Sequence, residues 1–167
     1  MDNPVVDRMV EVCTARGVAT LRFNFRGVGA SSGRHDEGRA EQDDVRASLT
    51  HLNDLLGAGA RVALAGYSFG AAMVAAAATS VPVAGLALVA PPLRVADLHR
   101  PVGVTGPIVV VAGAEDQYCP PSALEALRAM LPEATVVVIE GADHFFFDTL
   151  LPLGDAVGAW AAAIVAG

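Results

Sequence analysis

The pentapeptide Gly66-Tyr67-Ser68-Phe69-Gly70 has the residue types and spacing of a serine nucleophile. An apolar run, residues 62–65, precedes it, and a stretch of small residues with helical character, 71–78, follows it. This order predicts a strand, a sharp turn at Ser68 and a helix, so that the serine hydroxyl stands free above a sheet. The flanking glycines allow strand and helix to approach closely. The N-terminus of the helix favours the negative charge that develops during acyl transfer.

Two later strand ends carry the other residue types that a nucleophilic serine needs. Asp116 follows the apolar run 108–112, and His144 follows the Val- and Ile-rich run 134–140. The carboxyl ends of parallel strands meet at one edge of an open α/β sheet, so these side chains are expected near Ser68. We predict that Ser68 is the nucleophile, His144 the base, Asp116 the orienting acid and the Phe69 N–H an oxyanion donor.

Other interpretations of these residues stay open at this stage. Glu115 is a neighbour that could replace Asp116 as the acid, whereas Asp143 directly precedes His144 and is less able to reach its Nδ1. His144 alone could also be a structural histidine beside the aromatic run 145–147. The remaining histidines lie in a loop, a helix and a crossover and are expected to face solvent: His35, His51 and His99.

The elements that must position these residues alternate along the chain. This alternation predicts an α/β fold in one domain spanning residues 1–167, a three-layer sandwich with a mostly parallel, doubly wound sheet. About fifteen residues separate the third and fourth strands, near the minimum for a parallel crossover, so no large lid is expected there. The expected strands are 18–25, 62–65, 83–89, 108–112 and 134–140; the expected helices are 4–16, 41–56, 71–78, 122–131 and 153–165.

Composition and charge argue against several classes of protein. The net charge is −7, all eleven basic residues are arginine and none cluster, which disfavours nucleic acid and anionic membranes as partners. The uncharged stretch 62–93 is broken by Gly, Ser and Pro before it reaches the length of a membrane span. Without a signal peptide, and with Cys13 and Cys119 most simply free thiols, the chain is predicted to be cytoplasmic.

No cofactor or metal ion is predicted. The loop 24–31 is rich in glycine but has neither the G-x-G-x-x-G spacing nor a following lysine of a phosphate site. Glu41, Asp43 and Asp44 form an acidic group that could suggest a metal ligand set. They stand in the first turn of a predicted helix, where carboxylates are favoured by the helix dipole, and we prefer that interpretation.

Taken together, these motifs resemble those of the α/β-hydrolase superfamily, and more closely a group of small, lid-less bacterial hydrolases distantly related to dienelactone hydrolases. The resemblance covers essentially the whole chain. It implies Ser68, Asp116 and His144 as the catalytic triad. The segments that carry it are 21–29, 66–70, 89–92 and 141–146, together with Glu41 and Asp44.

The sequence departs from this family at its beginning. In that family the Met-Asp-Asn-Pro found here at residues 1–4 lies downstream of a His-Pro-His-Pro segment and a Gly pair. The resemblance therefore implies an N-terminally shortened α/β-hydrolase. The early strands would be lacking, including one between residues 18–25 and the strand before Ser68, together with the loop that usually gives a second oxyanion N–H.

The expected function is hydrolysis of a carboxylic ester or related acyl bond in a small molecule, through an acyl-enzyme. One rival is a catalytically weak or inactive α/β-hydrolase-like binding domain or fragment. A second rival, a nucleotide-binding doubly wound protein, is disfavoured by the missing phosphate fingerprint. The sequence leaves the bond type, the substrate and the oligomeric state open.

Overall fold

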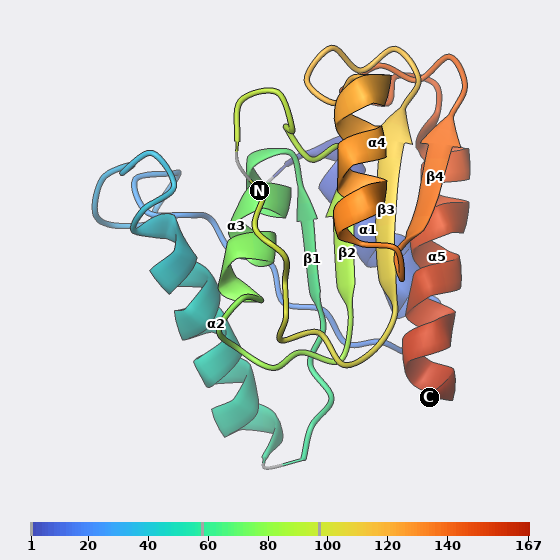
Figure 1. Cartoon of the computed structure of the whole chain (residues 1–167). Helices are drawn as coiled ribbons and strands as arrows, with labels where there is room; N and C mark the ends of the chain where they lie inside the picture. The colour runs from blue at the N-terminus through green and yellow to red at the C-terminus, as the bar shows by residue number, and fades with distance from the viewer. Residues whose placement is uncertain (1, 58, 97) are drawn as a thin grey trace.

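Four parallel strands form the centre of the molecule in the computed structural model, which describes residues 2–57, 59–96 and 98–167 (Figure 1). Their order across the sheet follows the chain, β1-β2-β3-β4, and every neighbouring pair is parallel. All four carboxyl ends therefore lie at one edge. The strands are β1 (Leu64–Tyr67), β2 (Leu86–Val89), β3 (Ile108–Gly113) and β4 (Thr135–Ile139).

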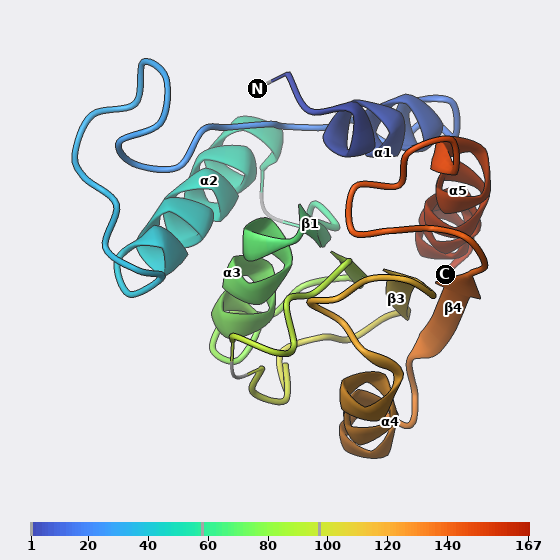
Figure 2. The same ribbon diagram turned by 90° about the horizontal axis from the view of Figure 1, so that it is seen from above.

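Helices cover both faces of this sheet, as Figure 2 shows. Helices α1 (Pro4–Thr14) and α5 (Leu150–Ala166) pack together on one face. Helices α3 (Phe69–Ala77) and α4 (Pro121–Met130) share the core on the other face, and α2 (Glu41–Leu56) packs outside α3. The predicted three-layer α/β sandwich with a parallel, doubly wound sheet is confirmed.

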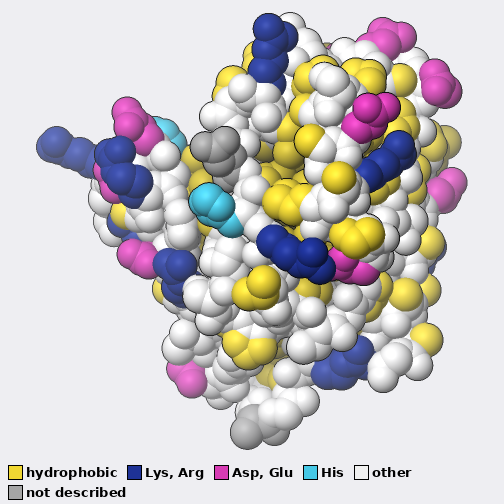
Figure 3. All heavy atoms as spheres, viewed as in Figure 1, with side chains coloured by type: hydrophobic (Ala, Val, Ile, Leu, Met, Phe, Trp, Pro, Cys, Tyr) yellow, Lys and Arg dark blue, Asp and Glu magenta, His cyan; other side chains and the backbone are white. Residues whose placement is uncertain are grey.

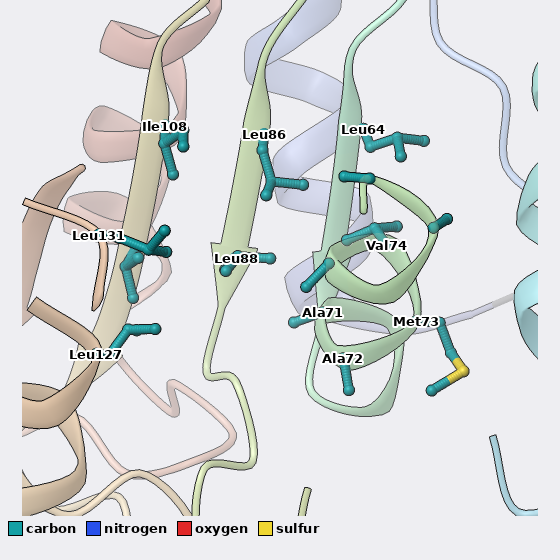
Figure 4. Close-up of a cluster of buried hydrophobic side chains, with 14 of the residues drawn as sticks. Leu64, Ala71, Ala72, Met73, Val74, Leu86, Leu88, Ile108, Leu127 and Leu131 are labelled. Atoms are coloured by element: carbon teal, nitrogen blue, oxygen red, sulfur yellow. The ribbon is translucent and has the colours of Figure 1, made fainter. Parts of the chain in front are cut away.

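The central strand β2 shows why its sequence is a continuous apolar run. Leu86 and Leu88 enter the core on the side of α3 and α4 (Figure 4), whereas Ala87 and Val89 enter the core formed with α1 and α5. All four side chains are buried because both faces of a parallel sheet are covered. Polar residues are consequently confined to the strand ends, where the candidate site lies.

Residues 18–25 do not form the predicted strand. The segment runs on the side of β1 opposite to β2 (Figures 1 and 2), and no strand in the described part of the chain pairs with it. Leu21 and Phe23 are partly exposed there. Its residues have strand propensity, but a strand also needs a hydrogen-bonded neighbour. The prediction of a strand at residues 18–25 was therefore wrong.

The other elements lie close to their predicted positions. The Asn3 side chain accepts hydrogen bonds from the Val5 and Val6 N–H groups, and Pro4 occupies the first position of α1. Strand β1 begins and ends two residues later than predicted. The crossover between β2 and β3 contains no helix in the residues that the structure describes.

Candidate active site

Ser68 lies between β1 and α3 in a backbone conformation that few non-glycine residues adopt, with φ 52° and ψ −119°. Its N–H donates to the Val89 carbonyl oxygen (2.9 Å), which ties the turn to β2. A Cβ atom on Gly66 would come within 2.3 Å of the Gly70 oxygen, so this close approach requires glycine. Both flanking glycines were expected to allow a close approach of strand and helix. For Gly70 this was wrong, because a Cβ there would meet nothing within 4 Å.

Ser68, His144 and Asp116 form a continuous chain of hydrogen-bonding atoms. Ser68 Oγ lies 2.8 Å from His144 Nε2, and His144 Nδ1 lies 2.8 Å from Asp116 Oδ2. Each residue follows a different strand: β1, β4 and β3 respectively. His144 and Asp116 are buried, which removes competing water from their contact. This arrangement can move the serine proton onto an imidazole that a carboxylate orients.

Backbone donors fix the Asp116 carboxylate in place. Its Oδ1 accepts from the Tyr118 N–H (2.8 Å) and the Cys119 N–H (3.2 Å), so Oδ2 is left for His144. Glu115 is exposed, and Asp143 Oδ1 accepts from the Phe145 N–H within its own turn. Asp116 is therefore the carboxylate that the structure brings to His144 Nδ1.

The loops after β3 and β4 are in direct contact, and this contact brings Asp116 and His144 together. The Glu115 N–H donates to the Ala142 carbonyl oxygen (2.9 Å). A Cβ on Gly113 would come within 2.2 Å of the same oxygen, so only glycine permits this approach.

Three aromatic rings surround the His144 imidazole. The rings of Tyr67, Tyr118 and Phe145 have their centroids 5.6, 4.8 and 5.5 Å from it. The Tyr67 hydroxyl also donates to the His144 carbonyl oxygen (3.0 Å). Burial, helped by the charges of Asp116 and Asp143, raises the pKa of Tyr67 to about 12, so this donor keeps its proton at neutral pH.

Sequence reasoning missed these aromatic contacts. They join residues that are far apart in the chain, and the available signal was that Tyr67 and Tyr118 stand one and two positions from Ser68 and Asp116.

Glu41, which the sequence analysis attributed to the helix dipole, lies in a buried network with the loop before α2. Glu41 is fully buried and accepts from the N–H groups of Asp36 (2.7 Å) and Gly38 (2.9 Å). His35 Nδ1 lies 2.7 Å from the same carboxylate. Burial raises the pKa of Glu41, but these hydrogen bonds outweigh burial and bring it below its ordinary value. The Glu41 side chain therefore organises this loop, beyond any effect of its place in the helix dipole.

A cavity of about 510 Å³ opens over Ser68. Its walls come from the segments that follow each of the four strands and from the loop before α2. His35 belongs to this lining, although its side chain is 62% exposed and its ring lies 5.6 Å from that of Phe69. The lining residues are His35, Glu37, Ser68, Phe69, Ala72, Met73, Pro92, Val95, Ala96, Tyr118, His144 and Phe145.

The described residues offer neither a metal site nor a membrane-spanning helix. They contain no group of three or more His, Cys, Asp or Glu side chains placed to hold a metal ion. Within the same residues, no helix combines the length and the hydropathy needed to cross a membrane. On the face seen in Figure 3, several arginine side chains lie beside acidic ones.

Comparisons with known proteins agree with the fold. Residues 1–150 match the alpha/beta hydrolase domain family, and the chain belongs to that family. Among solved structures, an alpha-beta serine hydrolase homologue from Coxiella burnetii is 34% identical, with a TM-score of 0.83 over 95% of this chain and 76% of that one. A serine hydrolase without a lid from Xanthomonas campestris is 31% identical, with a TM-score of 0.84 over 95% and 72%.

Curated relatives are longer than this chain. An uncharacterized protein from Mycobacterium tuberculosis is 30% identical over 77% of this chain and 53% of its own length. One from Rickettsia prowazekii is 38% identical over 42% of this chain and 30% of its own length. The chain thus spans about half or less of the curated relatives that it matches.

Proposed function

We propose that this chain is a serine hydrolase that cleaves a carboxylic ester or related acyl bond. The observation that carries the proposal is the relay Ser68 Oγ, His144 and Asp116, with 2.8 Å at each of its two contacts. The relatives named as serine hydrolases support the same class of chemistry. The substrate is a small molecule that the cavity over Ser68 can admit.

In the first half of the reaction, His144 Nε2 takes the Ser68 proton while Oγ attacks the acyl carbonyl carbon. Asp116 holds His144 with its proton on Nδ1 and stabilises the imidazolium that forms. The tetrahedral intermediate then collapses, and the imidazolium gives its proton to the departing alcohol oxygen. This leaves the acyl group on Ser68. Water repeats the sequence with His144 as base, which releases the acid and restores the serine hydroxyl.

The oxyanion of this reaction would form at the N-terminus of α3. The Phe69 N–H is among the first groups of that helix, which have no carbonyl partner within it. The helix dipole also favours negative charge at this end. One such donor typically contributes about 10²–10³ in kcat.

The rival function is a catalytically weak or inactive binding domain or fragment. The observation that favours it is the unpaired segment 18–25 beside β1. The two proposals differ in whether Ser68 supports turnover.

Hydrolysis of p-nitrophenyl butyrate tests the proposal. Ser68→Ala should lower kcat/KM by at least about 10³-fold, because the serine cannot be replaced as nucleophile. Ser80→Ala, an exposed serine just beyond the opposite end of α3, is the matched control and should keep the full rate. Equal rates for the wild type and Ser68→Ala would contradict the proposed function and favour the binding domain.

A further inference from the structure

We infer that the half of the cavity opposite His144 binds the acyl part of the substrate, and that it selects a neutral acyl chain of medium length. This inference rests on the proposed function. It adds a substrate class that the chemistry of the triad alone does not specify, because the same relay serves many acyl bonds.

The position of His144 decides which part of the substrate lies where. The imidazole must be next to the leaving oxygen in order to protonate it, so the alcohol departs on the side of His144, Tyr118 and Phe145. The acyl group stays attached to Ser68 until water arrives. It therefore needs room on the other side, over α3 and the segments that face it.

The wall on that side is one face of α3. Phe69, Ala72 and Met73 stand at positions i, i+3 and i+4 of this helix and all line the cavity. Ala72 and Met73 are buried, and Met73 points away from β2 and β3 (Figure 4). A Cβ on Gly38 would come within 2.9 Å of the Met73 Cε, so the Met73 thioether is held against the loop before α2.

Apolar residues after β2 extend the lining of the cavity beyond α3. Pro92, Val95 and Ala96 line it, and Val95 is 73% exposed at its mouth. An acyl chain that passes along α3 thus meets mainly methyl, methylene and ring groups, with His35 and Glu37 as the polar part of the lining. A fully buried methylene is worth roughly fourfold in an equilibrium or rate ratio.

The charges of the lining argue for a neutral chain. In the described part of the chain, the lining holds no arginine, and the sequence contains no lysine. At the rim, the Glu37 carboxylate pairs with Arg39 (3.2 Å). His35 is directed by its Nδ1 to the buried Glu41 carboxylate. Arg39 is already paired with Asp36 and Glu37, so a carboxylate at the end of an acyl chain would lose water here without gaining an unpaired cationic partner, which is unfavourable.

A series of p-nitrophenyl esters with one leaving group tests the chain length and the charge. From acetate to butyrate and hexanoate, kcat/KM should rise by roughly two- to fourfold per methylene. The p-nitrophenyl monoester of adipate has the six carbons of hexanoate, with a carboxylate in place of the terminal methyl group. Its kcat/KM should be lower than that of hexanoate by at least about tenfold. A flat series, or equal values for adipate and hexanoate, would overturn the inference.

Substitutions at two exposed valines, one in the cavity lining and one outside it, test which wall determines the preference for longer acyl chains. Val95→Asp places a charge at the mouth and should lower the ratio of hexanoate to acetate kcat/KM by at least about fivefold. Val102→Asp is the matched control, since Val102 is 72% exposed and lies outside the cavity lining; its ratio should stay at the wild-type value. Equal ratios for both variants would overturn the assignment of this wall.

The series also separates the inference from the proposed function. A flat series whose rates still depend on Ser68 would remove the acyl selectivity and leave the serine hydrolase intact. Rates that are the same in the wild type and in Ser68→Ala would overturn the proposed function and the inference with it.

Discussion

The Tyr67 hydroxyl donates a hydrogen bond of 3.0 Å to the backbone carbonyl oxygen of His144. Tyr67 is the residue directly before Ser68, so the segment that carries the nucleophile also holds the loop that carries the imidazole. The 2.8 Å contact between Ser68 Oγ and His144 Nε2 depends on the relative position of these two segments. A group that fixes both acts as a positioning residue for the proposed reaction.

Removing this hydroxyl should slow the reaction without weakening substrate binding. We expect Tyr67→Phe to lower kcat for p-nitrophenyl butyrate by about three- to tenfold with KM unchanged, since one neutral hydrogen bond is worth about 1 kcal/mol. Because the pKa of Tyr67 is raised to about 12, its hydroxyl stays protonated, and the ratio of wild-type to variant kcat should be the same at pH 7 and pH 9.

Tyr118→Phe is the control for Tyr67→Phe. Tyr118 contacts the imidazole with its ring, and phenylalanine keeps that contact. Its kcat should stay within about twofold of wild type, since a ring contact of similar area is retained. Equal losses in the two variants would contradict a specific role for the Tyr67 hydroxyl.

The identity of the acid can be tested by a second pair of variants. Asp116→Asn removes the charge that orients His144 Nδ1 and should lower kcat by about 10²–10⁴-fold. Glu115→Gln changes the adjacent, exposed carboxylate and should leave kcat within about twofold of wild type, because it touches neither His144 nor Ser68. A larger loss for Glu115→Gln than for Asp116→Asn would show that the assignment is wrong.

The two glycines around Ser68 should respond oppositely to alanine. Gly66→Ala forces a Cβ to within 2.3 Å of the Gly70 oxygen and should lower the free energy of unfolding by about 2–4 kcal/mol. Gly70→Ala meets open space in α3 and should change it by less than about 1 kcal/mol, in the stabilising direction. Urea unfolding of both variants measures the difference. Similar losses would mean that the turn is not packed as described.

Much of the candidate site could be predicted from the sequence because its residues are local to strand ends. Ser68, Asp116 and His144 each follow an apolar run within a few positions, and a parallel sheet brings such positions to one edge. The choice between Asp116 and Glu115 needed the structure. It depends on which carboxylate the N–H groups of Tyr118 and Cys119 hold toward His144.

The remaining features depend on contacts that local patterns do not encode. Residues 18–25 have the propensity of a strand, but pairing with a neighbour decides whether one forms. Glu41 has the residue type of a first helical turn, and its full burial follows from the path of the loop before it. The Tyr67 hydroxyl bond is likewise set by the meeting of two distant segments.

The ion pair between Arg26 and Asp44, which anchors the loop before α2, should make stability depend on pH. Hydrogen bonds from the Arg26 side chain, which outweigh burial, hold the pKa of Asp44 below its ordinary value. A carboxylate with a lowered pKa in the folded state stabilises the fold above its unfolded pKa, and this stabilisation is lost as the pH falls through the folded value. Asp44→Asn should therefore lower the urea midpoint at pH 7. The difference in midpoint between wild type and variant should shrink as the pH falls below the pKa of a free carboxyl group and through the lower pKa of Asp44.

Asp43→Asn is the control for this pH effect, because Asp43 is an exposed carboxylate of the same helical turn paired with Arg46. This variant should leave the urea midpoint close to that of the wild type at pH 7 and at acidic pH, since exposed pairs contribute little. A midpoint difference for Asp44→Asn that stays constant down to acidic pH would contradict the assigned ion pair.

Labelling by a fluorophosphonate, read by intact mass, tests most directly whether the relay around Ser68 is assembled. We predict a single adduct that maps to Ser68, that is absent in Ser68→Ala and that forms more slowly in Asp116→Asn, because the probe reacts with a serine only when a base activates it. No adduct on the wild-type chain, or an adduct at another residue that persists in Ser68→Ala, would contradict the central claim that this chain carries a working serine nucleophile.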